Sequence, residues 1–199
     1  MSAAGQVTTG FSKPYVATYS NSGTTISYSG VTQLARGVNV NVEPDTGEDN
    51  NFYCDNQVGE SVAGAFTSGT LTLSVDGLLM AAERLIMGLP SAVDSWTEYG
   101  DDQSIPYVGV GFVRRVMSDG VTSYIPYVLP KVRFDQITVA SETQEEEIDW
   151  QTEELSAKIF RADDSNRTWK KIGSGQTTEA AAEALVKTAL GYVAPAGSP

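Results

Sequence analysis

The sequence predicts a mainly β fold, a β-sandwich or barrel with one central helix and one C-terminal helix. Residues 38–43 and 70–75 alternate strictly between apolar and polar side chains, which is typical of strands with one buried face. Residues 119–120 are Asp-Gly, a hairpin signal, and β-prone runs at 107–117 and 121–129 lie on either side of it. These three features favour antiparallel strands joined by tight turns.

The N-terminal part adds two shorter strands to this scheme. Residues 13–19 and 24–30 are β-prone, and residues 21–23 between them carry a turn signal. After the alternating run at 38–43, Pro44 is expected to end the strand because proline cannot donate a ladder hydrogen bond. The chain is therefore predicted to leave the sheet at this point.

Residues 45–57 are predicted to form a long polar loop that carries two exposed aromatic residues, Phe52 and Tyr53. Loops of this length are uncommon unless they bind something or are mobile. Beyond the loop, residues 58–66 are expected to form a strand, and residues 68–69 (Ser-Gly) are expected to turn the chain into the alternating run at 70–75.

The clearest helix is predicted over residues 78–87. Asp76 is a suitable N-cap, Gly88 occupies the C′ position, and Pro90 follows just beyond the end. Apolar residues cover most of the helix circumference, so we expect other surfaces to enclose it. A methionine-rich groove for a partner is the alternative.

The C-terminal half predicts further strands and one close contact. Gly109 and Gly111 share one strand face and leave room for a backbone or a bulky side chain. Strands are expected at 131–139 and 147–160. In the second of these, the apolar residues occupy even positions before residue 152 and odd positions after residue 154. They can lie on one face of the strand only if a bulge or bend occurs near 152–154.

A final helix is predicted over residues 179–190. Thr177 or Thr178 is suited to cap its N-terminus, and Glu183 lies four residues before Lys187, a spacing that favours an ion pair on one helix face.

The length of 199 residues fits one domain with an appended segment. We assign residues 1–175 to the β-sandwich, including the helix at 78–87, and residues 176–199 to the C-terminal helix and a mobile tail.

The charge argues against nucleic-acid and membrane binding. Asp and Glu total 25 against 13 Lys and Arg, which gives a net charge of −12. Such a chain has few cations with which to displace counterions from DNA, and it is repelled by anionic lipid. Neither a membrane span nor a signal peptide is evident, and Cys54 is the sole cysteine, so we expect folding in a reducing cytoplasm.

No catalytic, cofactor or metal site is predicted. The chain has no histidine, so Cys54 lacks an activating base and most zinc or iron sites are excluded. The acidic cluster at 43–55 lacks the EF-hand pattern and is interpreted as a solvated loop, with a calcium site as the alternative. The acidic cluster at 142–149 is interpreted as a polar face beside a strand, and the glycines at 109–111 lack the remaining features of a nucleotide loop. A carboxylate-based hydrolase is the enzymatic alternative, although nothing singles out a pair of acids.

Several long strings of the sequence carry a family resemblance, among them GVNVNVEPDTGED at 37–49, YGDDQSIPYVGVGFVRRVMSDG at 99–120, YVLPKVRF at 127–134 and TQEEEIDWQTEEL at 143–155. These strings resemble the major tail proteins of long-tailed, non-contractile bacteriophages of Gram-positive hosts. The similarity covers roughly residues 11–172 and is weakest at the C-terminal helix.

The resemblance implies a non-enzymatic virion protein of the tail-tube type without cofactors. Such subunits form hexameric rings that stack into a hollow tube, and viral DNA passes through the tube without specific binding. The implied partners are copies of the same chain, together with the tape measure, tail terminator and distal tail proteins. The implied location is the virion tail, assembled in the host cytoplasm. The alternative is another virion β-sandwich module, a decoration or receptor-binding protein.

Two sets of residues are then candidates for functional roles. The first is the predicted loop, as the contact between successive rings, against the alternative of a mobile loop; its members are Asp45, Glu48, Asp49, Asn50, Asn51, Phe52 and Tyr53. The second is a polar, mostly acidic stripe predicted to line the lumen, against the alternative of an outer solvated face; its members are Glu147, Asp149, Gln151 and Glu153.

Overall fold

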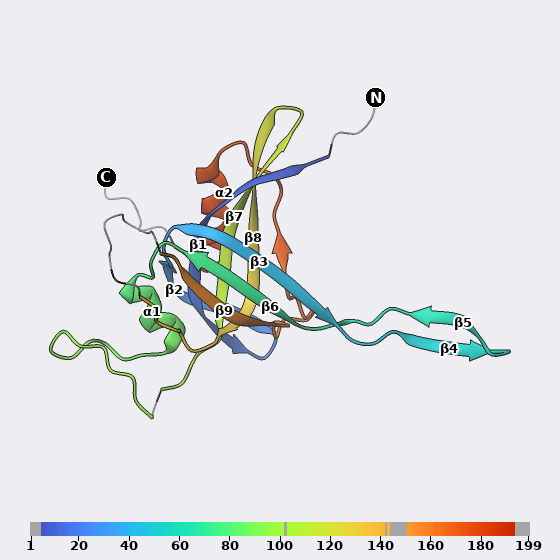
Figure 1. The fold of residues 1–199 in the computed structure, drawn as a ribbon, viewed down its shortest axis with the longest axis horizontal. Coiled ribbons are helices and arrows are strands. Elements are labelled where there is room, and N and C mark those ends of the chain that lie inside the picture. Colours follow the sequence, from blue (N-terminus) through green and yellow to red (C-terminus); the bar gives the residue numbers. More distant parts are fainter. Residues whose placement is uncertain (1–4, 102, 142, 144–150, 194–199) are drawn as a thin grey trace.

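The computed structural model describes residues 5–101, 103–141, 143 and 151–193 and confirms a mainly β fold with two helices (Figure 1). The elements in chain order are β1 (Val7–Ser22), β2 (Thr25–Gln33), β3 (Gly37–Thr46), β4 (Asn50–Cys54), β5 (Gln57–Val62), β6 (Phe66–Val75), α1 (Met80–Met87), β7 (Val108–Ser118), β8 (Val121–Phe134), β9 (Glu153–Phe160), β10 (Lys171–Ile172) and α2 (Glu179–Ala189).

One antiparallel sheet builds the body of the molecule, in the order β2-β1-β7-β8-β9-β6-β3, with β10 paired to β8. β8 joins the two halves of the sheet because its first part pairs with β7 and its last residues, Lys131 to Phe134, pair with β9. The sheet therefore folds over, so that β3, β6 and β9 face β1, β7 and β8. β2 and β3 are the edges of this sheet among the described strands.

The main core fills the space between the two halves. Its fully buried members on β6 are Leu71, Leu73 and Val75, as their alternation predicts. The facing half contributes Val108, Val110 and Phe112, which share one side of β7. α1 closes one end of the core with Ala82, Ile86 and Met87.

A second apolar layer lies on the other side of β7, under α2. Gly109 and Gly111 allow this close packing: a Cβ on Gly111 would lie 2.5 Å from Val186 Cγ1, and one on Gly109 would lie 2.8 Å from Leu190 Cδ2. Ala182, Val186 and Leu190 of the helix region are completely buried here. The prediction that a bulky group approaches these two glycines is confirmed.

The prediction for the start of the central helix is wrong. α1 begins at Met80 after an extended Leu79, and no side chain caps it. Asp76 instead accepts a hydrogen bond of 2.9 Å from the backbone N–H of Arg36 and another from the guanidinium of the same residue. The hydrogen bonds from Arg36 lower the pKa of Asp76. The predicted end is confirmed, since Gly88 has a left-handed backbone with φ of 66°.

Two predicted breaks in the β structure are absent. Pro44 does not end its strand, because β3 continues to Thr46 and Pro44 pairs with Gly69. An edge strand tolerates a proline there. Residues 68–69 are not a turn but lie inside β6, where Gly69 is buried between β3 and β9.

Other strands in the structure begin or end at residues different from those predicted. β1 starts at Val7, well before the predicted run at 13–19, and β8 runs through Pro130 to Phe134 without the predicted interruption. Of the strand predicted over 147–160, residues 147–150 lie outside the described residues, and β9 begins only at Glu153. The hairpin at 119–120 is confirmed by positive φ angles at both residues.

Candidate assembly surfaces

The most prominent feature of the molecule is an arm formed by residues 47–65, between β3 and β6. Figure 1 shows it projecting away from the body along the longest dimension of the chain. β4 and β5 pair along it, and Asp55 and Asn56 form the tight turn at its tip, with φ angles of 47° and 61°. The prediction of an irregular loop over 45–57 is therefore wrong, because this segment is largely a β-hairpin.

The arm has no hydrophobic core of its own. No described side chain within it is buried, and Phe52 and Tyr53 are 66% and 65% exposed. An isolated two-stranded hairpin is marginally stable in water, since it lacks a third strand or a packed face. These two aromatic residues therefore leave most of their surface uncovered by the chain itself.

The predicted contact residues are distributed along the base and first strand of the arm. Asp45 lies near the end of β3 and accepts a hydrogen bond of 3.2 Å from Ser68. The Asp49 carboxylate accepts one of 2.9 Å from the backbone N–H of Gly64, which ties the two sides of the arm together. The other predicted members are Glu48, which is exposed, and Asn50, Asn51, Phe52 and Tyr53, which belong to β4.

The arm is uniformly acidic. It carries Glu48, Asp49, Asp55 and Glu60, and no Lys or Arg occurs anywhere in residues 37–83. The arm therefore has a charge of −4 against no compensating cation. A charge distribution of this kind is complementary to a basic surface.

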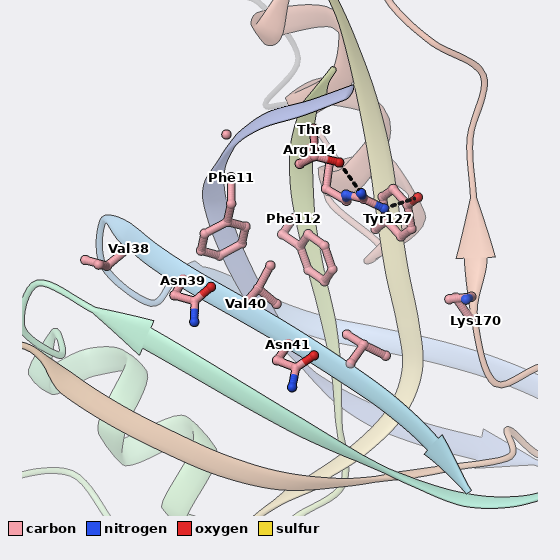
Figure 2. Close-up of a pocket in the computed structure, with 12 residues that line it drawn as sticks. Thr8, Phe11, Val38, Asn39, Val40, Asn41, Phe112, Arg114, Tyr127 and Lys170 are labelled. Carbon is pink, nitrogen blue, oxygen red and sulfur yellow. Dashed lines mark hydrogen bonds between the residues drawn. The ribbon is translucent and has the colours of Figure 1, made fainter. Parts of the chain in front are cut away.

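A groove of about 500 Å³ opens where edge strand β3 faces β1, β7 and β8 (Figure 2). Its floor is aromatic: the rings of Phe11 and Phe112 meet edge to face at 5.5 Å, and Tyr127 stacks on Phe112 at 5.4 Å. Val40 and Val42 of β3 supply the opposite wall. The groove gives access to the side of the main core at the edge of the sandwich.

Two cations lie in this groove. The Arg114 guanidinium donates a hydrogen bond of 2.8 Å to the Tyr127 hydroxyl and another to Thr8, and it lies 5.1 Å from the Tyr127 ring centroid. Lys170 lies at the other end, over the Trp169 ring. Within the described residues, neither cation forms an ion pair with a carboxylate. Sequence reasoning missed this groove because its residues come from strands far apart in the chain.

The outward face of β3, β6 and β9 is polar and weakly acidic. Its residues pair in three rows across the strands, rich in amide and hydroxyl groups: Asn39, Ser74 and Glu154; Asn41, Thr72 and Ser156; Glu43, Thr70 and Lys158. Asp45 continues the same side of β3 and pairs with Ser68. Three carboxylates and one ammonium give this face a net charge of −2, whereas the whole chain carries −12.

The predicted lumen stripe falls only in part within the described residues. Glu147 and Asp149 lie outside them, and Gln151 is exposed just before β9. Glu153 begins β9, where its carboxylate accepts a hydrogen bond of 2.8 Å from the backbone N–H of Leu78. Glu153 therefore has a local role at the start of the α1 region, whereas the neighbouring Glu154 belongs to the polar outward face.

α2 is held on the body by a charged cluster around Glu183. This carboxylate accepts a hydrogen bond of 2.6 Å from the Tyr15 hydroxyl and pairs with Lys187 at 2.7 Å and Lys13 at 3.4 Å. Burial by itself would raise the pKa of Glu183, but the hydrogen bonds and charges of these partners outweigh it and lower the pKa to about 2. The helix is capped by Thr178, one of its two predicted caps, and the predicted pair with Lys187 is confirmed.

A second exposed region lies at the end of the body away from the arm, in the segment between α1 and β7 (Figure 1). Val93 and Trp96 form an isolated bridge there, and Trp96 is among the most exposed large apolar residues of the described chain. The Tyr99 hydroxyl donates to the Glu83 carboxylate at 2.5 Å and so ties the segment to α1.

The comparisons with known proteins leave the chain without an assigned family. No protein-family model matches it, and no curated protein matches its sequence significantly. Within the described residues, no helix is long and apolar enough to cross a membrane. No group of three or more Cys, Asp or Glu side chains there is placed to hold a metal ion.

Proposed function

We propose that this chain is a structural subunit that polymerises into a hollow tube of the phage-tail type, through which DNA passes without binding. The observation that carries the proposal is the arm, an exposed aromatic hairpin with no core of its own. An element of this kind gains its packing from another molecule. The resemblance in sequence to tail-tube proteins supports copies of the same chain as that molecule.

The free edges of β2 and β3 supply a second means of association. An unpaired edge strand presents N–H and C=O groups that pair with another strand. In a ring, the edge of one sheet joins the edge of the next, so the sheets close into one continuous wall. Each subunit would then join its neighbours through β2 and β3 and reach the next ring through the arm.

The outward face of β3, β6 and β9 is the surface best suited to the lumen. Its amide and hydroxyl groups remain hydrated, and its single ammonium offers DNA almost no opportunity for counterion release. DNA in contact with such a wall would move along it instead of binding. A cryo-EM map of the assembled protein that places this face on the exterior would refute the assignment.

The arm provides the direct test of the proposed function. Gly47 and Gly64 lie in backbone contact at the base of the arm, so a deletion of residues 48–63 joins two points that are already adjacent. We expect the full chain to form rings or tubes by negative-stain electron microscopy. The deleted chain should remain a soluble subunit with an unchanged melting temperature, because the deleted residues contribute nothing to either core.

A matched substitution separates the arm from general surface effects. The double change Phe52→Ser and Tyr53→Ser should prevent tube formation. The change Val121→Ser removes an apolar side chain of the same 65% exposure as Tyr53, from the tip of a hairpin on the body, and should leave tubes intact. Tubes of normal length from the arm-deleted chain, or only discrete monomers or trimers from the full chain, would contradict the proposal.

A further inference from the structure

We propose that the groove between β3 and strands β1, β7 and β8 is the receptor for the arm tip of a second copy of this chain. The inference rests on the proposed self-assembly and identifies the surface that receives the arm. Two complementary features carry it. One is the match between an acidic arm and a groove whose two cations form no ion pair within the described residues, and the other is the match between exposed aromatic residues and an aromatic floor.

The arm and the groove carry charges of opposite sign, and among the described residues neither surface contains the counter-charge that would neutralise it. The arm carries four carboxylates without a cation, and the groove carries Arg114 and Lys170 without a carboxylate partner in the described structure. Arg114 is already held in place by Tyr127 and Thr8, so little side-chain freedom is lost when it binds an incoming carboxylate. Docking would give each of the two groove cations a carboxylate from the arm and would leave two of the four arm carboxylates hydrated.

The shapes are also compatible. A groove of about 500 Å³ is within the ~300–1,000 Å³ of typical ligand sites and accommodates an aromatic side chain with its neighbours. Figure 2 shows Phe11, Phe112 and Tyr127 around this space, with Arg114 at its upper end. Phe52 entering it would pack against aromatic rings and extend the core of the receiving body.

The arm tip reaches only another molecule. Eight residues from Gly47 to Cys54, at about 3.3 Å each, place the tip roughly 26 Å beyond the end of β3. Figure 1 shows that this direction leads away from the body, and hence from the groove of the same chain. A tip and a receptor at different places on one molecule make a head-to-tail contact, which propagates from copy to copy.

Cys54 makes the contact measurable. It is the sole cysteine of the chain and is exposed at the arm tip. Its Sγ and the Phe52 ring flank Gly59 together, since a Cβ on that glycine would lie 2.5 Å from Sγ and 3.6 Å from Phe52 Cδ1. A disulfide formed by Cys54 therefore reports the surface that Phe52 contacts.

The experiment mixes two proteins under assembly conditions. The first is the unaltered chain, with Cys54 in its arm. The second carries Cys54→Ser together with Thr8→Cys at the groove or, in a separate protein, Lys170→Cys at its other end. The control carries Cys54→Ser and Ala184→Cys, which places an exposed thiol on α2, outside the surfaces proposed for assembly. After mild oxidation, mass spectrometry quantifies the mixed disulfide, and electron microscopy records tubes.

We expect tubes, and at least a ten-fold excess of the mixed disulfide at one or both groove positions over the Ala184→Cys control. The change Phe52→Ser in the arm donor should remove this excess. Tubes with no groove disulfide above the control would overturn the groove as receptor and leave the proposed function standing. Absence of both assembly and groove disulfide would overturn both proposals, whereas groove disulfides without tubes would support the docking contact alone.

Discussion

The body and the arm use the same antiparallel pairing, but they differ in what lies behind the strands. β7 is covered on both faces, by the main core on one side and by α2 on the other. β4 and β5 are covered on neither, and no described side chain of the arm is buried. Hydrogen-bonded ladders alone contribute little net stability, whereas burial contributes most of it. Burial therefore stabilises the body by itself, whereas the arm lacks this stabilisation, which agrees with its proposed role in binding a second molecule.

The largest contrast should appear when one apolar residue is removed from each region. Leu73→Ala in the main core leaves a cavity between the halves of the sheet and should lower the free energy of unfolding by about 2–5 kcal/mol. Phe52→Ser in the arm should change it by less than ~0.5 kcal/mol. Urea unfolding of the unassembled subunit measures both. A large loss of stability from Phe52→Ser would indicate that the arm packs on its own body.

The next effect tests the close packing under α2. Gly111→Ala places a methyl group 2.5 Å from Val186 Cγ1 and should destabilise the body by about 1–3 kcal/mol through overpacking. Gly10→Ala is the matched control, since its new Cβ would meet Arg115 Cβ at an ordinary 3.7 Å. Thermal unfolding compares the two variants. Equal melting temperatures would show that α2 can shift away from the new methyl group without a loss of stability.

A smaller effect concerns pH. The pKa of Glu183 is lowered to about 2 from an ordinary 4.5. The ionised carboxylate therefore contributes fully to the stability of the fold above about pH 4.5, and this contribution is lost as the pH falls toward 2. Glu183→Gln should cost about 1–3 kcal/mol at pH 6, and the difference from the unaltered chain should shrink at pH 2.5. Unfolding measured at both values checks this. A difference that does not change with pH would contradict the assigned role of the carboxylate.

The smallest effect concerns the arm turn. Asn56 has φ of 61°, and glycine adopts this conformation without strain, so Asn56→Gly should stabilise the hairpin by a few tenths of a kcal/mol. The body hairpin already has glycine at the equivalent position, Gly120, where Gly120→Asn serves as the reverse control. Amide exchange across β4 and β5 measures the change. Faster exchange in Asn56→Gly would show that the Asn side chain itself supports the turn.

Local sequence patterns predicted the strands of the body well, because a strand such as β6 buries every second side chain and so requires an apolar residue there. The alternation around Leu73, the two glycines of β7 and the Asp-Gly turn all identified elements that the structure confirms. The arm was mistaken for a loop because no buried face imposes alternation on it. Its turn is Asp-Asn, which lacks the glycine of the strongest hairpin signals.

Position in the sheet explains the other errors. Pro44 would end a central strand, but β3 is an edge. Asp76 would cap a helix, but Arg36 from a distant segment binds it instead. The groove left no signal in the sequence, because Phe11, Phe112 and Tyr127 meet only when the sheet folds over.

The absence of Lys and Arg from residues 37–83 also affects how susceptible the free subunit is to proteolytic cleavage. Trypsin-like enzymes cut after these two residues, and exposed hairpins are among the easiest segments for a protease to bind. The arm, which has no buried side chain among its described residues, offers no such bond. An unassembled subunit would therefore keep its arm intact in the presence of a trypsin-like enzyme.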